Sequence, residues 1–250
     1  MLKKEREREI VSMLKNTDGF MTIKELCKKL YASESSIRRD LKSLENKGIL
    51  KKTYGGAELI TNYSMVIAFN KRAHHNTAAK KIIAKKAASL IKNGDIIFLD
   101  QSSSVFYLAN VLSVAADLTV VTNNIEIINL LSATNIKVIS SGGCLSRENR
   151  TCLVGNDAIR VFENIYADIC FFSAKSLSDG GTISDCTQEE VEIRRAMYEN
   201  ARKKVFLCDS EKFGTRSPYK QCELRDTDYL ISESDDAQKF RLVCDAIKIL

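Results

Sequence analysis

Hydroxyl and cationic side chains gather in one short segment near the start of the chain, and they are of the types that bind a polyanion. Ser35 and Ser36 stand beside Arg38 and Arg39, and Lys42 follows within one helical turn. Guanidinium and ammonium groups bind phosphate oxygens, while serine hydroxyls and arginine side chains also hydrogen-bond base edges. An isolated arginine pair is usually a solvated helix face, but the order and spacing of these residues favour contact with DNA.

Helical spacing before and within this segment predicts three short helices. The first ends between residues 16 and 19, the second covers residues 23–30, and the third begins after Ser33. Thr22 would cap the second helix in a capping box with Glu25. Two helices joined by a short turn, the second with polar and cationic side chains at its start, form a helix-turn-helix.

A two-stranded wing is expected directly after the third helix. Residues 49–52 and 57–60 have strand character, and Gly55 and Gly56 would form the turn between them. Two lysines and a tyrosine of this wing complete the set of predicted DNA contacts. That set is Ser35, Ser36, Arg38, Arg39, Lys42, Lys51, Lys52 and Tyr54.

The charge of the chain is concentrated in the same region. Residues 1–60 hold 14 Lys and Arg against 9 Asp and Glu, whereas residues 61–250 hold 24 against 23. A basic excess confined to the helix-turn-helix segment is typical of a phosphate-binding surface. The longer part of the chain is therefore not expected to bind nucleic acid.

Length and composition predict two domains without a membrane anchor. The chain has 250 residues, of which 44% are hydrophobic, enough for a small domain and a larger one with a sizeable core. We expect a DNA-binding domain at 1–60, a connector at 61–73 and an α/β domain at 74–250. No apolar run approaches the ~20 residues of a membrane span, and the start of the chain is charged, so a cytoplasmic protein is expected.

The eight cysteines do not indicate a metal site or a disulfide framework. No Cys-x-x-Cys occurs, and the two histidines are adjacent, at His74 and His75. Cys170 and Cys208 fall in apolar runs, where a thiol behaves as a small hydrophobic group. We expect reduced, mostly buried thiols and no metal or cofactor; Cys144, after two glycines, is the candidate for an accessible thiol.

From residue 76 onward, helical stretches alternate with short apolar strands. This alternation predicts a mostly parallel α/β sheet. The expected strands cover 95–99, 118–122, 136–140, 168–173, 204–208 and 228–231. The expected helices cover 77–91, a stretch ending near residue 112, 124–133, 156–164, 188–202 and 235–249.

In such sheets ligands bind outside the carboxyl ends of the strands. That rule selects the loops 100–104, 122–124, 140–144 and 209–214. In the first loop, Ser102, Ser103 and Ser104 would offer hydroxyls and free N–H groups at a helix start, which suits a phosphate. An ordinary helix cap is the alternative explanation of these serines.

Both parts of the chain resemble the DeoR family of bacterial transcriptional regulators. The first resemblance rests on S-E-S-S-I-R-R-D-L at 33–41 and K-x-Y-G-G-A at 52–57, and the second on a series of short motifs. Those motifs are D-x-S-S-S at 100–104, T-V-V-T-N at 119–123, S-G-G at 141–143, L-V-G at 153–155, E-E at 189–190 before R-A-M at 195–197, and D-S-E-K-F-G at 209–214. The resemblance implies a winged helix-turn-helix followed by a sensor domain, similar in fold to ribose-5-phosphate isomerase, that binds phosphorylated sugars or related metabolites.

The resemblance also implies the residues that would contact the effector. They are Asp100, Ser102, Ser103, Ser104, Asn123, Gly142, Gly143, Arg147, Glu190 and Lys212. Asp100 has an alternative role, which is to hold the loop in place rather than to contact the ligand. For Lys212 and Glu190 the alternative is a side chain that is simply exposed to solvent. Serine replaces a family glycine at Ser102 and at Ser176, so a narrower pocket or a different effector is expected.

Two classes of function follow from these observations. The first is a ligand-controlled DNA-binding regulator, in this family most often a repressor, which would act as a homo-oligomer on symmetric DNA sites. The second is a sugar-phosphate isomerase-like enzyme. An isomerase needs a carboxylate base beside the substrate carbonyl, and the predicted loops hold no paired acids; the basic first domain would also be unexplained. The sequence therefore favours the regulator.

Overall fold

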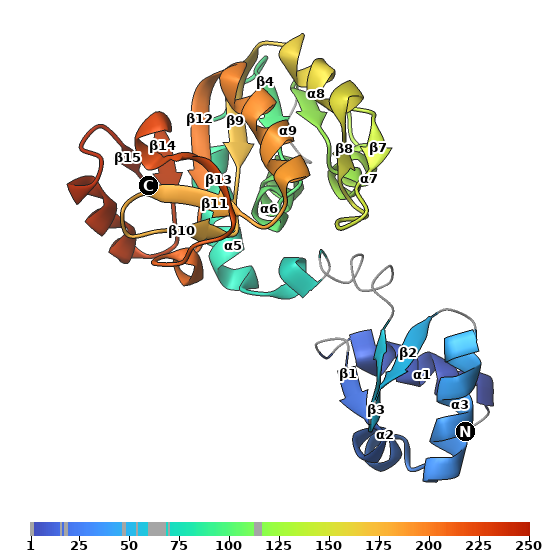
Figure 1. The fold of residues 1–250 in the computed structure, drawn as a ribbon. Coiled ribbons are helices and arrows are strands. Elements are labelled where there is room, and N and C mark those ends of the chain that lie inside the picture. Colours follow the sequence, from blue (N-terminus) through green and yellow to red (C-terminus); the bar gives the residue numbers. More distant parts are fainter. Residues whose placement is uncertain are drawn as a thin grey trace. The chain divides into compact units, whose positions relative to one another are not determined.

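The structure is a computed structural model, and it describes residues 3–15, 17, 20–46, 49–53, 55–59, 69, 71–112 and 117–250. Contacts between Cα atoms divide the chain into two compact units, Met1–Lys71 and Arg72–Leu250. We call them the N-terminal unit and the C-terminal unit (Figure 1). Each has its own apolar core.

The N-terminal unit is a winged helix-turn-helix, as predicted. Thr22 and Glu25 form the predicted capping box: the Thr22 hydroxyl accepts from the Glu25 N–H at 3.2 Å, and the Glu25 carboxylate accepts from the Thr22 N–H at 2.9 Å. A short strand before the second helix was not expected, and it extends the wing to three antiparallel strands. The elements are α1 (Lys3–Lys15), β1 (Phe20–Thr22), α2 (Ile23–Leu30), α3 (Glu34–Asn46), β2 (Leu50–Thr53) and β3 (Gly56–Leu59), with strand order β1-β3-β2.

Helix α3 turns its apolar face into this core. Ile37, Leu41 and Leu44 are buried beside residues of the other helices and the wing. Asp40 is also buried on that side, and its carboxylate accepts a hydrogen bond from Arg6 of α1 at 2.5 Å. Since one side of α3 is used for packing, its opposite side must face outward.

The C-terminal unit is built on a seven-stranded sheet in which all neighbouring strands are parallel. This arrangement confirms the predicted α/β class. The strand order is β15-β14-β12-β9-β4-β5-β6. These strands are β4 (Ile96–Leu99), β5 (Thr119–Thr122), β6 (Lys137–Ser140), β9 (Ala167–Phe172), β12 (Ala201–Leu207), β14 (Tyr229–Ile231) and β15 (Lys248–Ile249).

Alternate residues of the central strands feed two separate cores, because successive side chains of a strand point to opposite faces. Ile97 and Phe171 pack in the core that includes α5 (Thr77–Ala88), α6 (Ser103–Leu112) and α7 (Ile125–Leu131). Phe98 and Phe172 pack on the other face, with α8 (Asn156–Glu163) and α9 (Gln188–Glu199). The sheet is thus covered on both faces (Figure 1).

Two small antiparallel sheets were not predicted. A hairpin of β7 (Cys144–Leu145) and β8 (Leu153–Val154) follows β6. A second sheet, in the order β10-β11-β13, joins β10 (Ser176–Leu177), β11 (Thr182–Asp185) and β13 (Tyr219–Glu223). Both pack residues into the core that holds α8 and α9.

The predicted helix over 235–249 is wrong. Asp235–Leu242 form a 3₁₀ helix, and Lys248–Ile249 then pair in parallel with β14 as the edge strand β15. The period of a short apolar run does not distinguish a helix from a strand. Here residues 248–249 form a strand because they pair with the open edge of β14. Two other helices end early, α5 at Ala88 rather than residue 91 and α9 at Glu199 rather than residue 202, where β12 begins at Ala201.

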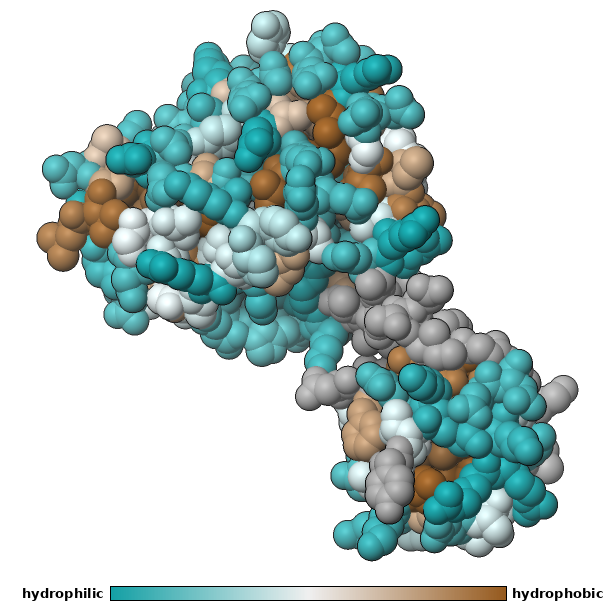
Figure 2. Space-filling model, viewed as in Figure 1, coloured by the Kyte–Doolittle hydropathy of each residue, from teal (hydrophilic) through white to brown (hydrophobic). Residues whose placement is uncertain are grey.

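The face of each unit that is visible in Figure 2 is mainly hydrophilic. Figure 2 shows teal residues over most of the visible face of both units, with apolar residues in small separate areas. Among the described residues, no helix is both long and apolar enough to cross a membrane.

Candidate functional site

The first candidate site is the outward side of α3 and the wing. The side chains of Ser35, Arg38, Arg39 and Lys42 are exposed and that of Ser36 is half-buried. The wing lysines Lys51 and Lys52 are exposed as well, while Tyr54 lies outside the described residues. The structure therefore presents the described members of the predicted DNA-contacting set to solvent.

Two of these cations are paired with acidic residues. Arg38 binds Glu34 one turn earlier at 2.6 Å, and Lys52 binds Glu45 at 3.2 Å. Glu45 also accepts from the backbone N–H of Lys52, and this bond is the main reason why the pKa of Glu45 lies below its usual value. Exposed pairs of this kind contribute little to stability, so a phosphate can replace the carboxylate at little cost. Glu45 thus ties the wing to α3.

The second candidate site is the carboxyl edge of the parallel sheet. The strand order places the loops that follow β12, β9, β4, β5 and β6 next to one another. Those loops begin with Cys208, Ser173, Asp100, Asn123 and Ser141. The four loops predicted to hold the effector follow β12, β4, β5 and β6, so all of them lie at this edge. The fifth loop, which begins with Ser173, lies between those after β12 and β4.

Arg194 of α9 is the centre of a buried ionic network at this edge. Its guanidinium contacts Asp100 at 2.8 Å, Asp185 at 2.8 Å and Glu190 at 3.1 Å, and the side chain is only 2% exposed. Burial alone would lower the pKa of Arg194, but the three carboxylates outweigh it and raise the pKa above the usual value. Glu190 also accepts from Gln101 at 3.1 Å and from Asn149 at 2.9 Å. Of the two readings of Glu190, the solvent-facing one is wrong, because this carboxylate is buried.

Asp100 holds its own loop. One carboxylate oxygen accepts from the Ser102 N–H at 2.9 Å, and the other accepts from Arg194 and from the Ser173 N–H at 3.2 Å. Burial raises the pKa of Asp100, and Arg194 opposes this effect. With all its surface buried and these three partners, Asp100 fixes the start of α6 relative to α9 and β9.

The three serines of the loop after β4 have different roles: one caps α6, and the other two have backbone N–H groups without an acceptor in the helix. The hydroxyl of Ser102 accepts from the Val105 N–H at 3.2 Å, so Ser102 caps α6. The backbone N–H groups of Ser103 and Ser104 belong to the first turn and have no acceptor within their helix. Ser102 and Ser176 are not among the described non-glycine residues with positive φ, so serine fits the backbone at both family glycine positions.

Several buried polar atoms at this edge have no hydrogen-bond partner within the described protein. They include the Ser104 hydroxyl oxygen and the Asn123 side-chain oxygen, and both residues are at most 1% exposed. The Asn123 side-chain nitrogen is fully engaged, donating to Gln101 and to the Leu153 carbonyl oxygen, each at 3.1 Å. Leaving such an atom unpaired costs about 1–3 kcal/mol, which a polar ligand could recover.

Lys212 lies at the next loop, after β12. Its ammonium donates to the Ser173 hydroxyl at 2.9 Å and pairs with Asp209 at 3.1 Å, and its side chain is 18% exposed. Although burial acts to raise the pKa of Asp209, Lys212 and Lys80 hold it below its usual value. Burial and the nearby Lys212 lower the pKa of Lys80 to about 8. Of the two interpretations of Lys212, the plain surface lysine is therefore wrong, because its ammonium is mostly buried and has two partners.

The loop after β6 contributes backbone rather than side chains. Gly142 and Gly143 have φ values of 60° and 93°. A Cβ on Gly143 would lie 2.6 Å from the Val154 carbonyl oxygen, so this glycine is needed for packing against β8. Arg147, in the turn of the β7–β8 hairpin, is exposed, and the structure does not bring its side chain into the buried network.

The sequence did not single out Arg194, Asp185, Gln101 or Lys80. A signal for Arg194 was available: it lies four residues after Glu190 and three before Met197, so it shares the buried face of α9. An arginine on an apolar helix face requires buried partners. No comparable pattern marks the other three, because their partners lie outside any helical or strand period: Gln101 bonds distant segments, while Asp185 and Lys80 bond residues across a turn.

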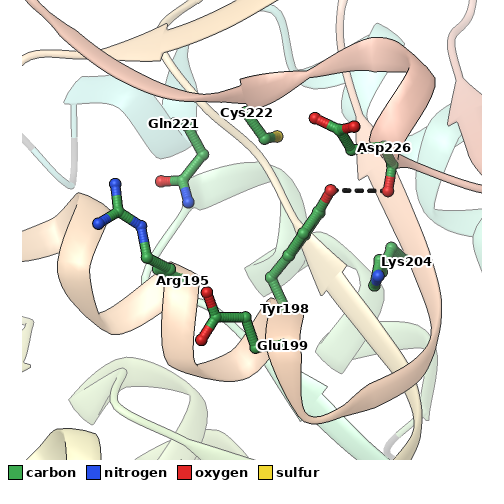
Figure 3. A pocket seen from close by; sticks show the side chains of 7 residues that line it. All are labelled: Arg195, Tyr198, Glu199, Lys204, Gln221, Cys222 and Asp226. Carbon is green, nitrogen blue, oxygen red and sulfur yellow. Dashed lines mark hydrogen bonds between the residues drawn. The ribbon is translucent and has the colours of Figure 1, made fainter.

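A surface depression elsewhere on the C-terminal unit holds none of the predicted site residues. Figure 3 shows it between α9, β12 and β13, with Tyr198 in its middle donating to the Asp226 carbonyl oxygen at 2.7 Å. Its volume is about 440 Å³, and two basic and two acidic residues line it. The balanced charge favours no anionic ligand. Its lining consists of Arg195, Tyr198, Glu199, Lys204, Gln221, Cys222 and Asp226.

The thiols do not form a further site. All eight cysteines are free, and Cys152, Cys170, Cys208, Cys222 and Cys244 are buried. Burial raises the pKa of Cys222 to about 12. Cys144 is exposed, as predicted, and Cys186 is exposed as well.

Solved structures resemble this chain only in outline. A D-ribose-5-phosphate isomerase in complex with phospho-erythronic acid aligns with a TM-score of 0.41 and 16% identity, over 54% of this chain and 52% of that one. An eIF2B beta subunit from Chaetomium thermophilum aligns with a TM-score of 0.49 and 16% identity, over 69% and 54%.

Comparison with known sequences is more informative. Residues 6–63 match the DeoR-like helix-turn-helix domain, and residues 75–234 match the DeoR C terminal sensor domain. The transcriptional regulator GolR of Listeria innocua is 36% identical over 92% of this chain and 90% of its own length. The repressor GlcR of Bacillus subtilis is 32% identical over 99% and 93%, and the lactose phosphotransferase system repressor of Staphylococcus aureus is 30% identical over the whole of both chains. With a helix-turn-helix and a sensor domain that both match, the chain belongs to the DeoR family of transcriptional regulators.

Proposed function

We propose that this regulator represses genes of carbohydrate metabolism and that a phosphorylated sugar or related metabolite, bound in residues 74–250, controls its binding to operator DNA. The observation that carries the effector part is the group of buried, unpartnered polar atoms around the start of α6. Two similar proteins whose names contain "repressor", one of them for a sugar phosphotransferase system, support the regulatory part.

For DNA, α3 would enter the major groove and the wing would lie against the backbone. Arg39, Lys42, Lys51 and Lys52 would bind phosphates and supply affinity. Ser35, Ser36 and Arg38 would reach base edges, and Tyr54 would add a contact from the wing. Arg38 would exchange Glu34 for a base, a replacement that its exposed position allows.

The two DNA roles can be separated by gel shift on DNA upstream of the gene. Arg38→Ala should relax discrimination between operator and unrelated DNA, because a base contact carries about 1–3 kcal/mol of specificity. Lys52→Ala should weaken binding to both DNAs alike and reduce the salt dependence. If the two variants change specificity equally, this division of roles is incorrect.

For the effector, the N–H groups of Ser103 and Ser104 and the Ser104 hydroxyl would bind a phosphate at the positive end of α6. Lys212, connected to this loop through Ser173 and Asp100, would neutralise the anion. The free oxygen of Asn123 would accept from a ligand hydroxyl. Gly142 and Gly143 of the loop after β6 and Arg147 of the β7–β8 turn would line the entrance.

A negative side chain at the phosphate position tests this site. Ser104→Glu should abolish the effect of the metabolite on DNA binding and leave the gel shift itself intact, because residue 104 lies outside the N-terminal unit. Ser89→Glu, an exposed serine at the end of α5, is the matched control and should keep the response. A retained response in Ser104→Glu would place the effector elsewhere.

We propose no enzymatic activity for the sensor domain. The carboxylates of Asp100 and Glu190 bond residues of the loop after β4, and both are paired with Arg194. A carboxylate held in this way is a poor base for proton abstraction. Turnover of ribose 5-phosphate by the purified chain would contradict this part of the proposal.

We also propose that the protein works as a homo-oligomer in the cytoplasm. Helix-turn-helix proteins commonly read two half-sites with two copies, because symmetric DNA matches a symmetric dimer. Sedimentation of the full chain should therefore show a dimer or a larger assembly. A monomer that binds the operator with full affinity would refute it.

A further inference from the structure

The first segment of the C-terminal unit contacts two of the elements that would form the effector site, α6 and the loop 209–214. Residues 71–74 are helical, and Asn76 then leads into α5 with a φ of 51°. A positive φ is uncommon outside glycine, so the surroundings must hold this junction. We call residues 72–76 the entry segment, since they connect to the N-terminal unit in sequence.

Lys80 makes the most buried of these attachments. Its ammonium donates to the carbonyl oxygen of Arg72 and, at 2.7 Å, to that of His75, and the residue is 4% exposed. These carbonyls lie at the end of the short helix before α5, so one cation binds two backbone acceptors of the entry segment at once.

Three more side chains reach the entry segment. The Tyr107 hydroxyl donates to the Ala73 carbonyl oxygen at 2.9 Å, and Tyr107 belongs to α6, the helix that starts with Ser103. Asn76 hydrogen-bonds the carboxylate of Asp209, and the His75 ring contacts Glu211 at 2.5 Å. Both acids lie within three residues of Lys212. The entry segment is thus attached to α6, whose first residues would hold the phosphate, and to the loop that carries Lys212.

Two cations, Lys212 and Lys80, interact with Asp209 in different ways. Lys212 pairs with it directly, and Lys80 is close enough to lower its pKa. In the structure Lys212 pairs with Asp209, and Lys80 binds the entry segment. A phosphate that draws Lys212 away from Asp209 would leave that carboxylate to Lys80.

We propose that Lys80 is a latch: when an anionic effector engages Lys212, Lys80 turns toward Asp209, releases the carbonyls of Arg72 and His75, and so loosens the entry segment. This inference rests on the proposed effector site. It identifies residues 72–76 as the segment through which ligand binding would affect the DNA-binding part of the chain.

Hydrogen–deuterium exchange of the full-length chain tests the latch without a ligand. Lys80→Met keeps the length of the side chain but removes both of its charged hydrogen bonds to the entry segment, and exchange over residues 72–76 should become at least roughly tenfold faster. Lys81→Met, on the exposed side of the same helix, is the control and should leave exchange unchanged. Tyr107→Phe, which is a milder change, should accelerate exchange in the same segment. If neither Lys80→Met nor Tyr107→Phe alters it, the latch is refuted.

Inorganic phosphate at millimolar concentration tests the coupling. It should speed exchange over residues 72–76 in the wild type and protect the start of α6, whereas Lys80→Met should show the protection without a further change in the entry segment. Protection of α6 with no change at 72–76 in the wild type would overturn the inference. If phosphate does not protect α6 at all, the proposed effector site fails, and the comparison of Lys80→Met with Lys81→Met still decides whether Lys80 holds the segment.

Discussion

Replacing Arg194 by methionine should severely destabilise the C-terminal unit. The change removes one guanidinium and leaves Asp100, Asp185 and Glu190 facing one another, and Asp100 is completely buried. Removing one partner of a buried ion pair costs about 3–5 kcal/mol, because the remaining charge is left without compensation. We expect a loss in this range in the free energy of unfolding at pH 7.

The buried thiols provide an assay that reports on this unit alone. Five cysteines of the C-terminal unit are buried, whereas the N-terminal unit holds only Cys27. Labelling with a thiol reagent during a urea titration, read by mass spectrometry, therefore measures unfolding of the C-terminal unit separately. The control is Arg195→Met, since Arg195 is exposed on the same helix and its loss should change stability by no more than about 0.5 kcal/mol.

The loss caused by Arg194→Met should also depend on pH. Burial already raises the pKa of Asp100, and without Arg194 the pKa must rise further. A carboxyl whose pKa is higher in the folded state binds more protons there, so folding is favoured as the pH falls below that raised pKa toward about 4. The difference between variant and wild type should therefore shrink on acidification. A loss below about 1 kcal/mol at pH 7, or one equal to that of Arg195→Met, would refute the network as described.

Three other changes test local features, each by thermal or urea unfolding. Asp40→Ala removes the α3 carboxylate that accepts from the Arg6 guanidinium of α1 and should cost the N-terminal unit about 3 kcal/mol; a loss that disappears at high salt would mean that the two side chains form only a surface pair. Thr22→Ala removes the cap of α2 and should cost about 1 kcal/mol; no loss would mean that the capping box is not formed in solution. Gly143→Ala should cost clearly more than Gly142→Ala, because only the former adds a Cβ 2.6 Å from a carbonyl oxygen; equal losses would contradict the packing described for the β8 side of the loop.

The fold could be predicted largely from the sequence because its signals are local. Ile37, Leu41 and Leu44 mark one face of a helix by spacing alone, and the run at 96–99 marks a buried strand. The failure at 235–249 has a different origin: Lys248 and Ile249 form a strand only because β14 offers them a free edge, which no local pattern contains.

The site was less predictable, since its contacts join distant segments. Ser102 and Asp100 could be chosen from their place after a strand, but the contact of Asp100 with Arg194 links positions 94 residues apart. Likewise, nothing local shows that Lys80 binds the segment before its own helix rather than solvent. Loop positions are therefore predictable from topology, while the partners that decide each charge's role require the folded structure.

The most direct test of the account measures the anisotropy of a labelled duplex, taken from the DNA upstream of this gene, as the full chain is added. We expect tight binding that weakens steeply between about 50 and 200 mM salt, weaker binding to an unrelated duplex, and a change in Kd with at least one sugar phosphate that Ser104→Glu abolishes. Equal affinity for both duplexes, together with no response to any sugar phosphate, would contradict the account.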